Sequence, residues 1–338
     1  MDIQQNFGTI FVLKIYLYIL RCNCVYSDFL KSLIFRHGDW YGGKGLGVCQ
    51  LEIDGIDLTV FVSHTIAEYD PNHDIYLGHR VVHGLESAQW LNMTTGATDL
   101  TLYCGDFNTE PSTVVYRLLN CIVPLKDAWV EHTGEDFGGE TCETAQNSFT
   151  IPGSKSKRID YIMYRPGPSV EAETVNCWLP LPNKVPQQNF SYSDHEAVAA
   201  IFKVKKSSDS KLFQSGPEFR RCLSEKNRLE TIQAGQDAIE IIDKSLTSVS
   251  SDQFKYVVYS FSILIFLVLS FIPSSYIPQT YFMAFDVGIF LPRFVMTIFL
   301  VIFFLMATIF NKRERNALIS TKRELKLILN QDCSPIQG

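Results

Sequence analysis

The sequence predicts an α/β fold, an α+β sandwich of two sheets covered by helices, followed by a C-terminal two-helix transmembrane hairpin. Two amphipathic helices, at 74–91 and 111–119, fall between some of the predicted strands, and two long apolar runs follow near the C-terminus. Five apolar segments between Val48 and Val204 have strand character, namely "GVCQLEI", "IDLTVFVSH", "DLTLYCGDFN", "RIDYIMYR" and "AVAAIFKV". Strands that dominate with helices between them favour sheets packed on each other under covering helices.

The two apolar runs, residues 256–272 and 294–310, contain no charged residue. Each would form a helix of about 25 Å, the short end of a membrane span. Basic residues flank the pair on its outer sides, namely Lys255, Lys312, Arg313 and Arg315. The positive-inside rule then places both outer flanks in the cytosol and the connection 273–288 in the lumen. We expect a multi-pass protein of an intracellular membrane (endoplasmic reticulum, Golgi or the inner face of the plasma membrane).

Composition excludes some classes of function. The formal net charge is −6 with a pI near 5.7, so the chain lacks the basic surface that nucleic-acid binding needs. Its nine cysteines are scattered without a zinc-binding pattern, which favours reduced thiols in a cytosolic domain. Residues 9–20 are apolar but contain Lys14 and are too short to span a bilayer, so we expect a buried strand there.

Polar side chains follow four of the apolar segments. They are His64, then Asp106 with Asn108, then Asp160, and finally Asp194 with His195. Side chains at strand ends converge on one edge of a sheet. Carboxylate oxygens suit Mg²⁺, a histidine paired with a carboxylate can take a proton from water, and a second histidine or an amide can stabilise a phosphoryl oxygen. Taken singly, each motif is an ordinary turn or loop, and "GDFN" consists of common turn residues.

The order of "SH", "GDFN", "RIDY" and "SDH" resembles the DNase-I-like endonuclease/exonuclease/phosphatase fold. Four further stretches, "HGDWYGGKGLG", "SHTIAEY", "DIYLGHR" and "SDHEA", are similar to the neutral sphingomyelinases. The C-terminal hairpin resembles that of the small mammalian-type members. The resemblance covers roughly residues 37–315. It implies Mg²⁺-dependent, phospholipase-C-type hydrolysis of sphingomyelin to ceramide and phosphocholine, with lyso-type choline phospholipids as further substrates.

The resemblance also implies roles for individual residues. His195 would be the general base and Asp160 would orient it, while Asp194 and Asp106 would act at the metal. Asp106 and Asn108 would hold the attacking water and the phosphate, and His64 would stabilise the phosphoryl charge or protonate the leaving oxygen.

Two other features invite a ligand-binding interpretation. Lys44 lies in "GGKG", which is similar to a phosphate loop and suggests substrate binding, but it lacks the spacing and the Ser/Thr of a nucleotide site. His79 and His83 are spaced i, i+4 on the 74–91 helix. No glutamate lies between them as in a zinc protease, and an ordinary helix surface is the favoured interpretation.

The chain departs from the family pattern at its N-terminus. Members of the family begin with a strand that ends in Asn-Cys-Trp-Gly and a second that ends in the principal metal-binding glutamate, and neither is found before "HGDW". Asn23 and Cys24 faintly resemble the first motif, and Ile66 stands where relatives often have a second histidine. We therefore expect an incomplete sheet, and either a shortened version of an active enzyme or a catalytically inactive membrane-bound paralogue.

These observations predict a division into five parts: a divergent N-terminal segment (1–36), a partial phosphodiesterase domain (37–205), a linker and amphipathic helix (206–255), the transmembrane hairpin (256–310) and a cytosolic helical tail (311–338). The expected partner is the lipid bilayer with its sphingomyelin substrate, and not nucleic acid. Two alternatives stay open. One is a nuclease or inositol phosphatase of the same fold, which predicts basic clusters around the cleft. The other is a membrane scaffold that binds partners through its amphipathic helices.

Overall fold

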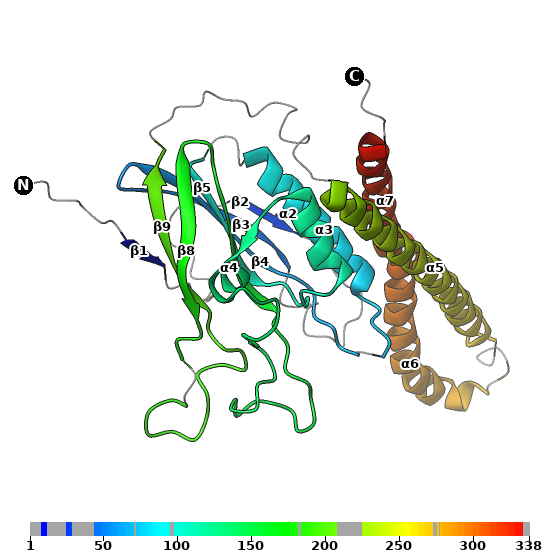
Figure 1. The fold of residues 1–338 in the computed structure, drawn as a ribbon. Helices are drawn as coiled ribbons and strands as arrows, with labels where there is room; N and C mark the ends of the chain where they lie inside the picture. Colours follow the sequence, from blue (N-terminus) through cyan, green and yellow to red (C-terminus); the bar gives the residue numbers. More distant parts are fainter. Residues whose placement is uncertain are drawn as a thin grey trace, which may run out of the picture.

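The computed structural model shows two sheets with helices on the outer face of one of them (Figure 1). It describes residues 8–11, 25–28, 44–70, 72–94, 98–181, 184–207, 225–272, 276 and 278–333. The larger sheet has the order β2-β3-β4-β5-β7-β6, and the smaller one has the order β1-β9-β8. Most of the segment 9–20 that was expected to form a buried strand lies outside the described residues, apart from the start that belongs to β1.

The strands of the larger sheet are β2 (Val25–Asp28), β3 (Gly45–Ile53), β4 (Ile56–His64), β5 (Leu100–Asp106), β6 (Lys126–Asp127) and β7 (Asp160–Pro166). The smaller sheet contains β1 (Gly8–Phe11), β8 (Val170–Trp178) and β9 (Ala199–Lys206). The five predicted strands are confirmed as β3, β4, β5, β7 and β9. Strand β8 was missed, although "VEAETVNCW" shows the polar–apolar alternation of a strand with one face against a core.

The central strands β4 and β5 are covered on both faces. Leu58, Leu100 and Ile162 face the smaller sheet and pack with Phe202 of β9. Phe61, Tyr103 and Met163 point the other way and pack under α2 (Leu77–Thr94) and α3 (Val114–Ile122). A parallel pair of strands buried on both faces explains the near-continuous apolar run "LTLYC". A short helix, α4 (Ala128–Thr133), precedes β7.

The register across the larger sheet decides where its functional side chains lie. Strand β4 pairs with β5 in parallel, whereas β3 pairs with β4 and β7 pairs with β5 antiparallel. Gly45 lies opposite His64, His64 opposite Asp106, and Asp106 opposite Asp160. These four residues therefore form one row across four adjacent strands. His64 and Asp106 are the last residues of β4 and β5, whereas Gly45 and Asp160 are the first residues of β3 and β7.

Gly105 makes the close approach of β4 and β5 at this row feasible. Its φ is 142°, a conformation that side chains rarely adopt, and a Cβ atom there would overlap the carbonyl oxygen of Ser63 on β4. The turn residue at the start of "GDFN" is thus required for strand packing immediately before the acidic side chain.

The C-terminal helices are longer than the sequence indicates. Helix α5 (Glu225–Leu269) is a single helix that joins the predicted amphipathic segment to the first apolar run. Helix α6 (Gln279–Leu305) continues through a π-helical turn (Met306–Phe310) into α7 (Asn311–Cys333). Two segments are long and apolar enough to cross a membrane, with mean hydropathies of 1.5 and 2.5, and in each only 6% of the most apolar window is buried. Apolar side chains that the protein itself leaves uncovered favour contact with lipid.

The N-terminal half of α5 and helix α7 pack against α2 and α3. Val82 and Leu85 of α2, together with Val115 of α3, join Ala238 and Leu318 in one apolar cluster. This contact corrects the expectation that His79 and His83 lie on an exposed helix surface, because both are buried and His79 Nε2 lies 3.1 Å from the carboxylate of Glu314 on α7.

Arg293 of α6 holds the far end of the hairpin together. Its guanidinium donates to the backbone oxygen of Ser270 at 2.6 Å and to the Ser270 hydroxyl at 3.0 Å, and it lies 3.3 Å from Asp286. It therefore caps the C-terminal end of α5, where backbone carbonyls carry partial negative charge.

Candidate active site

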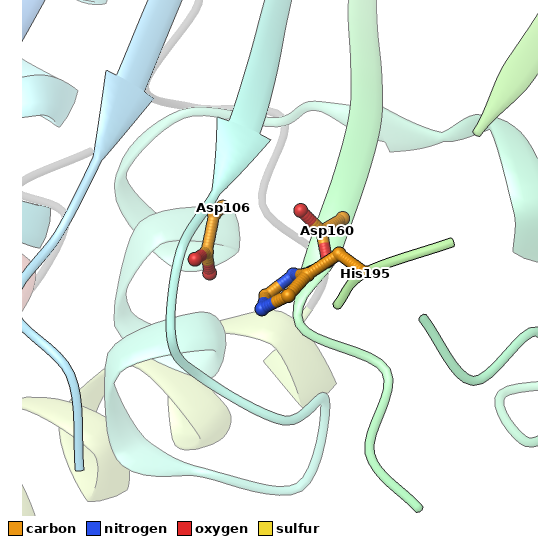
Figure 2. Close-up of side chains that lie close together, drawn as sticks. All are labelled: Asp106, Asp160 and His195. Carbon is orange, nitrogen blue, oxygen red and sulfur yellow. The ribbon is translucent and has the colours of Figure 1, made fainter. Parts of the chain in front are cut away.

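Figure 2 shows Asp106 and Asp160 at adjacent strand ends, with the imidazole of His195 between them. His195 comes from the loop between β8 and β9, and its Nδ1 lies 2.8 Å from Oδ2 of Asp160. One metal-ligating atom from each of the three residues lies within 4.8 Å of the other two. The sequence prediction that these residues converge is therefore confirmed in geometry, while their roles stay predictions.

Thr141 joins the loop of His195 to the start of β7. Its hydroxyl accepts hydrogen bonds from the backbone N–H groups of Ile159, at 3.2 Å, and Asp160, at 3.1 Å. Its backbone oxygen accepts from Glu196 N–H at 2.6 Å. Thr141 is 1% exposed, so these bonds are shielded from water and fix Asp160 and His195 relative to each other. Sequence reasoning missed this residue because nothing in "GETCE" marks it.

The protonation of His195 depends on its acidic neighbours. Burial of the imidazole by itself lowers its pKa, but hydrogen bonds with Asp160 and Cys142 and the charges of Asp160 and Asp106 outweigh burial and raise the pKa to about 11. The imidazole is therefore protonated at neutral pH when only these side chains surround it. A cation held by the carboxylates would offset their charge and lower the pKa of His195.

Asp106 is positioned by the turn that follows it. One carboxylate oxygen accepts from the Asn108 backbone N–H at 2.8 Å, and the other accepts from the Asn108 side-chain amide at 3.2 Å. The same amide donates to the backbone oxygen of Thr65 at 3.1 Å, and Asn108 has a positive φ of 45°. Asn108 therefore orients Asp106, and its predicted contact with substrate stays a prediction.

His64 lies between a basic and an acidic neighbour. Its Nε2 is 2.8 Å from the Lys44 ammonium and 3.2 Å from Oδ2 of Asp106. An ammonium can only donate and a carboxylate can only accept, so one nitrogen cannot satisfy both at once. Lys44 is 4% exposed and directly precedes β3, which places the "GGKG" lysine at the site.

Asp194 lies outside the group that could hold a metal. Its side chain is exposed, and Oδ1 accepts from the Ser193 hydroxyl at 3.1 Å. Its predicted metal role stays a prediction. The two carboxylates of the group Asp106, Asp160 and His195 suit a divalent cation that prefers oxygen ligands. Among the residues that the structure describes, no glutamate belongs to this group.

A cavity of about 320 Å³ opens beside His195. Asp160 and Glu196 contribute polar side chains to it, while Leu181, Tyr192 and Val198 line its apolar side. A cavity with both characters, next to a histidine–carboxylate pair, can accept a phosphate ester that carries a partly apolar group.

Comparisons with known proteins give the family of this chain. The model of the endonuclease/exonuclease/phosphatase family matches residues 21–195, so the match begins within the segment 1–36 that was predicted to be divergent. A putative neutral sphingomyelinase of Caenorhabditis elegans is 31% identical over 87% of this chain and 67% of its own length. One of Drosophila melanogaster is 27% identical over 87% of this chain and 74% of its own. Mouse sphingomyelin phosphodiesterase 2 is 35% identical over 54% of this chain and 45% of its own length.

The chain therefore belongs to the endonuclease/exonuclease/phosphatase family, and within it to the neutral sphingomyelinases. This places a phosphoester hydrolase on the two-sheet sandwich predicted from the sequence.

Proposed function

We propose that this chain is a membrane-anchored sphingomyelin phosphodiesterase that releases phosphocholine and leaves ceramide in the bilayer. The observation that carries the proposal is the row of His64, Asp106 and Asp160 across one sheet edge, with His195 against Asp160 and Lys44 against His64. The relatives named as sphingomyelin phosphodiesterases give the substrate class.

In the proposed mechanism His195 takes a proton from the attacking water at Nε2, since Nδ1 is engaged by Asp160. Asp160 fixes the tautomer and stabilises the imidazolium that forms, as carboxylates do in other histidine–carboxylate pairs. In this proposal Lys44 and His64, which lie 2.8 Å apart, stabilise the charge that develops on the phosphoryl oxygens and on the leaving oxygen of ceramide. The bond between phosphorus and the ceramide oxygen breaks, the ceramide oxygen takes a proton from His64, and the water oxygen stays on phosphocholine.

We propose Mg²⁺ as the cation that Asp106 and Asp160 hold. Such a cation would neutralise charge on the transferring phosphoryl group, which is a principal contribution to phosphoryl-transfer catalysis. The carboxylates are oxygen ligands of the kind that Mg²⁺ prefers, and Asn108 already orients one of them.

We further propose that α5 and α6 cross the membrane and that the catalytic domain lies on the cytosolic side. The basic residues outside the hairpin support this orientation under the positive-inside rule.

The test is the release of phosphocholine by the purified full chain in sphingomyelin proteoliposomes, with Mg²⁺ or with EDTA. We expect release only with Mg²⁺, and a loss of about 10²- to 10⁴-fold in kcat for His195→Ala. His132→Ala, on α4, is the matched control and should keep the parent rate. Equal rates for His195→Ala and the parent would contradict the assigned base. No release by any variant would favour the non-catalytic alternative.

A further inference from the structure

An exposed apolar surface lies at the rim of the active site. It is formed by four side chains on the two long loops that follow α4 and β8, which we call the apolar rim: Phe149 (53% exposed), Ile151 (64%), Phe190 (48%) and Tyr192 (39%). Tyr192 precedes His195 by three residues and lines the cavity beside it. Large apolar side chains that gather on surface loops next to a site indicate a contact surface.

The two loops are fastened to each other. The backbone N–H of Ser148 donates to the hydroxyl of Ser191 at 3.0 Å, and the N–H of Ser191 donates to the hydroxyl of Ser148 at 2.8 Å. Since Phe149 follows Ser148 and Phe190 precedes Ser191, this reciprocal pair holds the two phenylalanines on adjoining segments. Asn147 adds a bond from its amide to the backbone oxygen of Ser193 at 2.9 Å.

The turn that carries Ile151 is also held in place. The carboxylate of Glu143 accepts from the Ile151 backbone N–H at 2.8 Å and from the Ser154 hydroxyl at 2.5 Å. The carboxylate of Glu143 is thus engaged within its own loop. The basic side chain of Lys155, 84% exposed, extends from the same loop. Aromatic, aliphatic and lysine side chains together are typical of segments that enter a membrane interface.

The loops and the hairpin face the same end of the molecule. In Figure 1 the long loops that follow α4 and β8 extend toward the lower part of the view, where the last turn of α5 and the first turn of α6 also lie. The contacts of α5 and α7 with α2 and α3 fix the catalytic domain relative to the hairpin. A bilayer that contains the hairpin is therefore within reach of the apolar rim.

We propose that the apolar rim inserts into the headgroup region of the bilayer that holds the hairpin. The active site would then reach a lipid phosphate at the depth of the phosphate groups in the bilayer, and the lipid would not have to leave the membrane. The inference rests on the proposed function for its lipid substrate, whereas the insertion itself does not require hydrolysis.

The test uses added tryptophans in the full chain, reconstituted with EDTA in phosphatidylcholine or in brominated phosphatidylcholine, which quenches nearby tryptophan. Ile151→Trp probes the rim. Met93→Trp is the control, at a residue that is 67% exposed on the last turn of α2, away from the loops in Figure 1. Emission of the parent, with its four tryptophans, is subtracted. We expect the emission added at 151 to be quenched about threefold or more relative to that added at 93. Equal quenching at the two positions would overturn the proposal.

A second measurement separates this inference from the proposed function. The double variant Phe149→Ser with Phe190→Ser should lose about tenfold in rate on sphingomyelin vesicles and keep its rate on detergent-dispersed sphingomyelin. Met93→Ser should change neither rate. Unchanged hydrolysis of vesicles by the double variant would refute the insertion of the apolar rim but not the proposed function. Strong quenching at 151 without hydrolysis by any variant would refute only the proposed function.

Discussion

His195 and Asp160 are 35 residues apart in the chain and form a 2.8 Å hydrogen bond at the edge of the larger sheet. Asp160 begins β7 directly opposite Asp106, which ends β5. This relationship determines how the imidazole is oriented and how strongly it holds its proton.

Replacement of Asp160 by Asn should remove the charge that holds the proton on His195. We expect kcat at saturating Mg²⁺ to fall by about 10²- to 10⁴-fold, because the base is no longer oriented and the proposed cation loses one carboxylate ligand. The pKa of His195, raised to about 11 by its acidic neighbours, should decrease, so the rise of activity with pH should move to lower pH. Asp136→Asn, an exposed carboxylate, is the control. An unmoved pH profile in Asp160→Asn would exclude this coupling.

Thr141→Val should weaken the site without touching the substrate. It leaves the N–H groups of Ile159 and Asp160 without their acceptor, which costs about 1–3 kcal/mol in a buried position. We expect a lower melting temperature and a kcat reduced about tenfold with KM unchanged. Thr141→Ser retains the hydroxyl and should restore kcat. If the serine variant behaved like the valine variant, packing of the methyl group, and not the hydrogen bonds, would be the cause.

Gly105→Ala should be among the most destabilising alanine substitutions at a glycine. The added Cβ would overlap the Ser63 carbonyl oxygen, and φ of 142° disfavours any side chain, so a loss of about 3 kcal/mol or more is expected. Gly153→Ala is the control for backbone strain alone, because its φ is 87° and no atom lies within 4 Å of the added Cβ. Its cost should be about 1 kcal/mol. Thermal unfolding in detergent measures the loss of stability in both variants. Equal losses would mean that the structure relaxes around the Cβ atom at position 105, and would contradict the prediction.

The contact between α2 and α7 should weaken as the pH rises. Burial and the charge of Glu324 raise the pKa of Glu86 from 4.5 to about 7. The folded chain therefore retains a proton that the unfolded chain loses above pH 4.5. The stability contributed by protonated Glu86 is complete below that pH and is lost as the pH rises through about 7. Glu86→Gln should thus raise the melting temperature more at pH 8 than at pH 5, whereas exposed Glu52→Gln should do so at neither pH. An equal gain at both pH values would contradict the prediction.

The sequence predicted the strands with clear apolar runs and the residues at their ends, because apolar periodicity and turn residues can be recognised within a short stretch of the chain. The single row that brings His64, Asp106 and Asp160 together depends on strand register, which no local pattern encodes. Thr141 acts through tertiary hydrogen bonds, and the burial of His79 comes from helices far along the chain. Asn108 illustrates the same limit, since the hydrogen bond from its amide to Asp106 depends on the conformation of the turn.

The most direct test of the central claim is hydrolysis of sphingomyelin by the full chain in water enriched in ¹⁸O, with the products identified by mass spectrometry. Attack by a water that His195 deprotonates predicts one ¹⁸O atom in phosphocholine and none in ceramide. Label in ceramide, release of choline with ceramide phosphate, or no product from the parent chain would contradict the account.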